Sequence, residues 1–273
     1  MIKDVMVRLE GTAGDDARLS AAQEIIEIFD GRVIALYINI LPLIPPDEES
    51  GIYLGDLMEQ TRTAGDKTEA ALAKKLERLG KPTEIRRHDV FANLVADIAA
   101  REARAADVFV ALRPNGRVKD TEGLVESVLF GSGHHLFLVP GGKRARANFD
   151  HVLVAWNGSR EAARAVSEAM PYLLKARTVT IIVVHESQPT EAEAKLGTEA
   201  VKYLLHHGVD ATHEQVIRRN RGVGATLIDE ARKREADMIV MGGYGHSRLR
   251  EWLLGGTTYE LIHETPVPLL LAH

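Results

Sequence analysis

Five of the chain's 23 glycines fall within the seventeen residues from Gly242 to Thr258, directly after the apolar run DMIVM. Because glycine has no Cβ, its backbone N–H groups can come close to a ligand. A helix that begins at such a place adds unpaired N–H donors and the positive end of its dipole. These properties suit a phosphate or another anion, so this segment is the first candidate binding site.

Apolar runs and helical patterns alternate around this segment. In the second half of the chain we predict strands at residues 151–156, 179–185, 211–217, 237–241 and 266–272. The residues between them have helical spacing at 159–175, 191–208 and 225–236, with Ser159 as an N-cap and Pro171 as a residue that should kink or end its helix. Continuous apolar strands separated by helices predict an α/β fold with a doubly wound parallel sheet.

The chain also contains an internal repeat. DVMVRLEGT at 4–12 resembles HVLVAWNGS at 151–159, and AADVFVAL at 105–112 resembles EADMIVMG at 235–242. A third pair begins at residues 128 and 261. We therefore predict two α/β domains in tandem, at 1–142 and 148–273, with the extra length of the first in its early Pro-rich stretch.

The last strand of each copy is flanked by prolines, which is typical of a sheet edge. We expect the two copies to pair through these last strands inside one chain. The alternative is that the prolines alone protect both edges.

Composition excludes several classes of protein. The formal net charge is −5 and the basic residues are interleaved with acidic ones, so we expect no nucleic-acid partner. No apolar stretch approaches the roughly 20 residues of a membrane-spanning helix, and we expect no membrane partner. The chain has no cysteine, and its first residues resemble a strand rather than a signal peptide. We expect a cytoplasmic protein.

The spacing of the glycines is specific. Gly242, two residues, Gly245, nine residues and Gly255, followed by Gly256 and Thr257, resembles the nucleotide-binding loop of the universal stress protein family. The resemblance extends to the first and last strands of the second copy and, more faintly, to the first copy. It implies two adenine-nucleotide alpha-hydrolase-like domains, and hence a tandem universal stress protein.

In the ATP-binding branch of that family, an Asp after the first strand contacts the nucleoside, a residue at the end of the second strand lines the adenine pocket, and the loop holds the phosphates. The resemblance therefore implies ATP or another adenine nucleotide as ligand. The site residues that it implies are Asn157, Gly158, Val184, Met241, Gly242, Gly245, His246, Gly255, Gly256 and Thr257.

Two of these residues depart from the family pattern. Asn157 replaces the Asp, so a charge-assisted hydrogen bond becomes an ordinary one. Gly256 replaces a Ser or Thr, although the hydroxyl of Thr257 or Thr258 is close in sequence. His246 can supply a cationic contact to phosphate, and the alternative is a solvated side chain.

The first copy lacks the glycine loop. Leu112 stands at the position of Gly242, and Glu122 stands at the position of Gly255 after a spacing that is three residues shorter. Glu10 keeps an acidic residue at the position of Asn157. We predict that this copy binds no nucleotide and serves as a pairing module.

We expect a regulatory protein and not an enzyme, because no nucleophile, base and acid come together in a known motif. The pairs His134–His135 and His206–His207 are poor chelates, and we expect no metal site. GVGAT at 222–226 lacks the ending of a Walker sequence. The alternative function is an interaction or dimerisation module without nucleotide; a weak hydrolase would need a general base that we do not find. A homodimer of the whole chain stays open.

Overall fold

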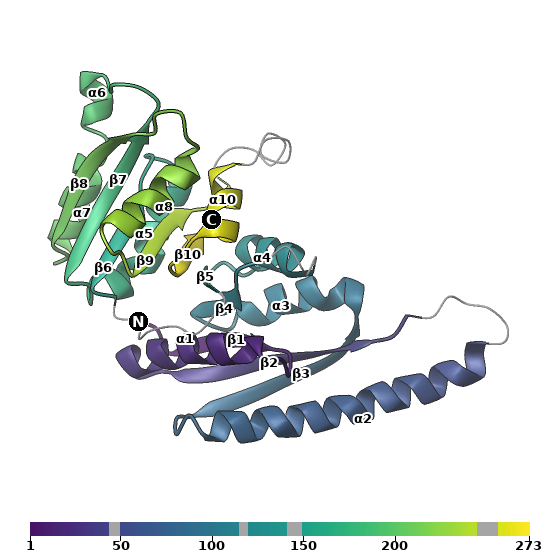
Figure 1. The fold of residues 1–273 in the computed structure, drawn as a ribbon. Coiled ribbons are helices and arrows are strands. Elements are labelled where there is room, and N and C mark those ends of the chain that lie inside the picture. The colour runs from purple at the N-terminus through teal and green to yellow at the C-terminus, as the bar shows by residue number, and fades with distance from the viewer. Residues whose placement is uncertain (44–49, 115–119, 141–148, 245–255) are drawn as a thin grey trace. The chain divides into compact units, whose positions relative to one another are not determined.

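A computed structural model describes residues 1–43, 50–114, 120–140, 149–244 and 256–273, without the side chains of 50–53 and 120–122. The chain forms two compact units (Figure 1). The first comprises Met1–Leu112 and Lys119–His134, and the second comprises Arg113–Val118 and His135–His273. Each unit is a parallel sheet with helices, which confirms the predicted α/β class.

The sheet of the first unit has the strand order β3-β2-β1-β4, and all three pairings are parallel. Its strands are β1 (Asp4–Leu9), β2 (Arg32–Leu41), β3 (Thr83–Phe91) and β4 (Val108–Leu112). Its helices are α1 (Gly14–Phe29), α2 (Ser50–Glu77), the 3-10 turn η1 (Ala92–Leu94), α3 (Val95–Ala103) and α4 (Asp120–Gly131). The side chains of β1, β2 and β4 are almost all buried, as their apolar sequences predict.

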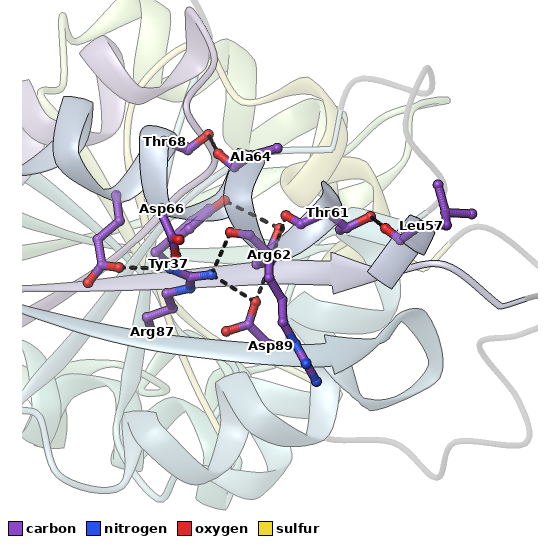
Figure 2. A network of polar contacts seen from close by, with 11 residues as sticks. Tyr37, Leu57, Thr61, Arg62, Ala64, Asp66, Thr68, Arg87 and Asp89 are labelled. Atoms are coloured by element: carbon purple, nitrogen blue, oxygen red, sulfur yellow. Dashed lines mark hydrogen bonds and ion pairs between the residues drawn. The ribbon is translucent and has the colours of Figure 1, made fainter. Parts of the chain in front are cut away.

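The extra length of the first copy lies largely in α2, which has 28 residues. A polar network holds the middle of this helix to the sheet (Figure 2). Arg87 of β3 donates hydrogen bonds to Asp66 and to the carbonyl of Arg62, and also to Asp89 at 3.0 Å. Burial raises the pKa of Asp89. Hydrogen bonds from Asn39 and Arg87 lower this pKa by more than burial raises it, so it lies below its ordinary value. Asp89 is therefore ionised at neutral pH and pairs with Arg87.

The sheet of the second unit has the order β5-β10-β9-β6-β7-β8. Its strands are β5 (His135–Val139), β6 (His151–Ala155), β7 (Thr178–His185), β8 (Ala211–Ile217), β9 (Met238–Gly242) and β10 (Leu269–Ala272). Its helices are α5 (Arg160–Leu173), α6 (Glu191–Ala194), α7 (Thr198–His206), α8 (Val223–Lys233) and α10 (Thr257–Glu264). All pairings are parallel except that of β10 with β5. The predicted pairing of the two last strands is thus confirmed, and it is antiparallel.

Strand β5 ends the first copy of the repeat but belongs to the second compact unit. His135 is 2% exposed, and its ring nitrogens bond Glu168 at 3.0 Å and the Tyr172 hydroxyl at 3.2 Å. The ring of Phe137 stacks on Tyr172 and meets Phe149 edge to face. These contacts give His135 a packing role within the second core.

Helix α5 continues through Pro171 and ends two residues later at Leu173, with a hydrogen bond from Leu174 N to Met170 O past the proline. One local prediction in the second unit needs correction. The predicted helix at 191–208 is two helices, α6 and α7, separated at Gly197 with a φ of 100°. A Cβ at Gly197 would lie 3.2 Å from Val183 Cγ2, so glycine lets the chain turn directly on the sheet. The predicted N-cap is confirmed, since Ser159 accepts a hydrogen bond from Ala162 N.

Candidate functional site

The candidate site lies at the carboxyl ends of β6, β7 and β9. Strand β6 pairs with β7 on one side and β9 on the other, so the strand order reverses there, which is where doubly wound sheets bind ligands. This edge brings together Asn157 and Gly158 after β6, Val184 near the end of β7, and Gly242 at the end of β9. Gly245, His246 and Gly255 lie outside the described residues.

Gly242 packs against the first turn of α5. A Cβ at this position would lie 2.3 Å from the carbonyl carbon of Glu161 and 2.5 Å from Ala162 N. Any other residue would push the helix from the strand. This glycine therefore has a packing reason besides the predicted approach of a ligand to bare backbone. The neighbouring Met241 is 5% exposed, so its side chain belongs to the core and only its backbone reaches the edge.

The described ends of the glycine loop meet at Thr258. Tyr244 has a φ of 55°, and its N–H lies 3.3 Å from the Thr258 hydroxyl. Thr258 is 3% exposed, so its hydroxyl serves the loop's own backbone. Thr257, the first residue of α10, is half-buried. It directly follows Gly256, the position at which the family pattern has a Ser or Thr hydroxyl.

Helix α10 begins at the end of this loop. Its N-cap Gly256 has a φ of −66° and a ψ of 163°, and no side chain caps the helix there. The acid in its first turn, Glu260, accepts a hydrogen bond from Ala225 N at 3.1 Å and thereby caps α8 instead. Its carboxylate is thus engaged by another helix, and within the described ranges no side chain is recorded as capping the start of α10.

Glu260 also explains the GVGAT segment. A Cβ at Gly222 or Gly224 would lie 2.5 Å from a carboxylate oxygen of Glu260. The two glycines therefore accommodate an acid of the chain itself at the N-terminus of α8. Sequence reasoning missed Glu260, and the available signal was a Gly-x-Gly directly before a helix with no Walker ending.

Asn157 is exposed, but part of its side chain is already used. Its Oδ1 accepts a hydrogen bond from Ser159 N at 3.1 Å, so the Nδ2 group is what it can offer a ligand. Gly158 has a φ of 73°, and a Cβ there would lie 3.0 Å from Leu196 Cδ1. Val184 is half-buried. The nucleoside end of the predicted site thus contains one amide donor and apolar groups, among them Leu196, which the sequence did not suggest.

Side chains at the start of α5 already accept hydrogen bonds from the N–H groups of its first turn. Glu161 is 5% exposed, and its pKa is lowered mainly by the hydrogen bond to its own backbone N–H, with help from Arg160 and against the effect of burial. Ser159 accepts from the next N–H, that of Ala162. An anionic ligand at this edge is therefore better served by α10 than by α5.

The corresponding turn of the first unit is filled by a carboxylate. Asp15 is 0% exposed and accepts hydrogen bonds from the backbone N–H groups of Glu10 at 3.0 Å, Gly11 at 2.8 Å and Thr12 at 3.2 Å. Arg18 pairs with Asp15 at 2.8 Å and with Glu10 at 2.6 Å. The donors that would meet an anionic ligand after β1 are thus already satisfied, in keeping with the prediction that this copy binds no nucleotide.

Within the described ranges, no three His, Cys, Asp or Glu side chains are arranged to hold a metal ion. Across the same parts of the chain, no helix has the length and apolarity needed to cross a membrane.

Comparison with known proteins identifies the family. Residues 148–273 match the model of the Universal stress protein family. A curated universal stress protein of Mycobacterium tuberculosis is 30% identical over 89 residues, which are 32% of this chain and 30% of that protein. The chain thus spans about a third of the length of this curated relative.

One solved structure supports the fold. A universal stress protein from Archaeoglobus fulgidus is 16% identical, covers 98% of this chain and 95% of its own, and has a TM-score of 0.75. Another, crystallised in complex with cAMP, is 23% identical over 45% of this chain and 96% of its own, with a TM-score of 0.38. Residues 148–273 therefore belong to the universal stress protein family.

Proposed function

We propose that residues 148–273 bind an adenine nucleotide, ATP or a close relative, and that the chain is a regulatory protein without enzymatic turnover. One observation supports this most directly. The carboxyl edge that contains Asn157 and Val184 is joined through Gly242 to the start of α10, whose N-cap Gly256 has no side-chain cap among the residues that the structure describes. An anion at the start of α10 would meet unpaired N–H groups and a favourable dipole.

Each part of the nucleotide has a partner in this proposal. The phosphates lie at the start of α10, with the Thr257 hydroxyl beside them. The ribose accepts a hydrogen bond from Asn157 Nδ2, because Oδ1 is already bonded to Ser159 N. The base lies towards Val184. The family resemblance assigns Gly245, His246 and Gly255 to the phosphates as well, and these three lie outside the described residues.

The proposed activity is a binding switch. A bound nucleotide shifts a conformational equilibrium of the protein only by its differential affinity for the two states, and the favoured state then presents a changed surface to a partner. In this proposal the first unit binds no nucleotide and serves as a pairing module, because Asp15 already bonds the N–H groups of the turn after β1. No general base for hydrolysis is part of this proposal.

Calorimetry with ATP tests the proposal. Saturating ATP at about a hundred times its dissociation constant should stabilise the protein by about 2.7 kcal/mol, which a thermal shift detects readily. Absence of both heat and thermal shift at millimolar ATP would refute nucleotide binding.

The variant Asn157→Asp sharpens this test. It restores the carboxylate of the family pattern and keeps an oxygen for Ser159 N. A charged hydrogen bond exceeds a neutral one by roughly 1 kcal/mol, so we expect up to about tenfold tighter ATP binding. The matched control is Asn93→Asp, an exposed position in the first unit, which should leave the affinity unchanged. Equal affinities of Asn157→Asp and the unchanged protein would place the ribose elsewhere.

The second candidate is an interaction module that binds no nucleotide. The observation in its favour is that Gly242 and Asn157 each have a role within the fold, the first against α5 and the second at Ser159 N. Protein purified without added ligand would then show no adenine absorbance. A Gly245→Val variant would also keep full partner binding, whereas the nucleotide proposal expects a loss.

A further inference from the structure

Leu196 is fixed in place by polar side chains from two strands. Gln215 of β8 donates hydrogen bonds from Nε2 to the carbonyls of Ala194 at 3.1 Å and Leu196 at 3.0 Å. The other end of the same amide, Oε1, is bonded by His185 Nε2 at the end of β7. Gly197 then turns the chain directly on Val183. The segment between α6 and α7 is thus held against the sheet by its backbone.

This arrangement places an apolar side chain at the nucleoside end of the candidate site. Leu196 Cδ1 lies over Gly158, next to Asn157, and remains partly exposed. Its own carbonyl is bonded by Gln215, so the backbone offers no competing acceptor there. Val184 immediately precedes His185, whose ring anchors Gln215.

The first unit uses the same framework differently. The strand registers put Asn39 and Arg87 at the positions of His185 and Gln215. Asn39 donates to the carbonyl of Thr61, so it holds the crossover helix α2. Arg87 donates to the carbonyl of Arg62 and holds the same helix, as Figure 2 shows.

The side chain over the turn glycine is what differs. Over Gly11, the counterpart of Gly158, the first unit places Thr68 of α2, whose hydroxyl donates to Ala64 O at 3.1 Å (Figure 2). A Cβ at Gly11 would lie 2.7 Å from Thr68 Cγ2. An unbroken helix thus covers the turn in the copy that we expect to bind no nucleotide, and a single leucine after a helix break covers it in the other.

We propose that Leu196 is the apolar wall against which the base of the nucleotide packs, and that Gln215 is the positioning residue that holds this wall in place. The inference rests on the proposed function. Its physical basis is that the face of a purine is largely apolar, so that contact with an aliphatic side chain removes apolar surface of both from water.

Binding of ATP, adenosine and tripolyphosphate to Leu196→Ala tests the inference. We expect about tenfold weaker binding of ATP and of adenosine, because about 1.4 kcal/mol of apolar contact is lost. Tripolyphosphate, which has no base, should bind as it does to the unchanged protein. Leu196→Met should restore the affinity for adenosine, since a volume-conserving apolar side chain keeps the contact.

Two further variants complete the design. Leu205→Ala removes a leucine that is 50% exposed on α7 and should change no affinity. Gln215→Ala should weaken adenosine binding without changing tripolyphosphate binding. If the unchanged protein binds ATP and Leu196→Ala binds it within twofold, or loses tripolyphosphate equally, the inference is overturned while the proposed function stands. If the unchanged protein binds no ATP, both fall.

Discussion

At the scale of single residues, carboxylates of the chain itself decide which backbone donors remain for a ligand. Asp15 fills the turn after β1, Glu161 fills the first turn of α5, and Glu260 fills the start of α8. Each of these carboxylates occupies a group of backbone N–H donors that would otherwise attract an anionic ligand. The start of α10, where Gly256 stands, has no such residue among its described neighbours.

Asp15→Asn should destabilise the first unit strongly. The buried side chain would lose its charge opposite Arg18, and breaking a buried ion pair costs about 3–5 kcal/mol. Asp16→Asn is the matched control, because the Asp16 side chain is 73% exposed and its pair with Lys75 should contribute less than about 1 kcal/mol. Urea unfolding measures both. Similar losses for the two variants would contradict a special role for Asp15.

Glu161 should make stability depend on acid pH. Its pKa is lowered in the folded state, so its contribution is complete above the unfolded pKa of about 4.3 and is lost as the pH falls through the lower folded value. The unfolding free energies of the unchanged protein and of Glu161→Gln should therefore differ at pH 7 and converge as the solution becomes strongly acidic. Glu199→Gln, at an exposed acid of α7, should show no such convergence. A constant difference at all pH values would refute the assignment.

At the scale of elements, α10 is held from both ends. Glu260 in its first turn bonds Ala225 N at the start of α8. Arg113 donates from Nη1 to the carbonyls of His263 at 2.8 Å and Thr265 at 2.9 Å, and so caps the other end. Because α10 follows the glycine loop directly, these two contacts fix one end of that loop.

Glu260→Gln should weaken this anchoring. The amide oxygen can still accept from Ala225 N, but the charge at the start of α8 is lost, which should cost about 1 kcal/mol. Glu264→Gln, at the exposed opposite end of α10, is the control and should cost nothing. Thermal unfolding provides the comparison, and ATP binding should weaken in Glu260→Gln alone. If the melting temperature of Glu260→Gln is unchanged, the Glu260 carboxylate is not the reason that positions 222 and 224 are glycines.

At the scale of the whole molecule, the repeat and the compact units divide the chain at different places. The sequence copies predict a second domain at 148–273, and its bounds remain a prediction. Compactness adds β5, because β5 pairs with β10 and its aromatic side chain fills the second core. The second unit thus depends on a strand that precedes its copy of the repeat.

Two fragments test this dependence. Residues 135–273 should fold as a stable unit, whereas 148–273 should be less stable by at least about 3 kcal/mol, the usual cost of losing one large buried aromatic side chain such as Phe137. The shorter fragment would also expose the edge of β10 and should associate in size-exclusion chromatography. Equal stability of two monomeric fragments would contradict the dependence.

The sequence by itself determined the α/β class, the strands, the repeat, the family resemblance and the pairing of the last strands. These features depend on local patterns: apolar runs of strand length, glycines at fixed spacing and prolines beside edge strands. Ser159 was predictable as an N-cap for the same reason, because its partner lies three residues away. The glycine at 197 was visible, but its φ of 100° and the helix break were not, since they depend on contact with β7.

The tertiary structure alone decided which donors and surfaces are already used. Glu260 bonds Ala225 of α8, 35 residues earlier in the chain, and Gln215 fixes Leu196, 19 residues before it. His135 joins the second core across 37 residues through Tyr172. These contacts join residues that are far apart in the sequence and meet only through tertiary packing, so no local sequence pattern predicts them. The glycine loop was therefore readable from sequence, whereas the carboxylates that fill competing helix starts, and the leucine beside the nucleoside position, required the fold.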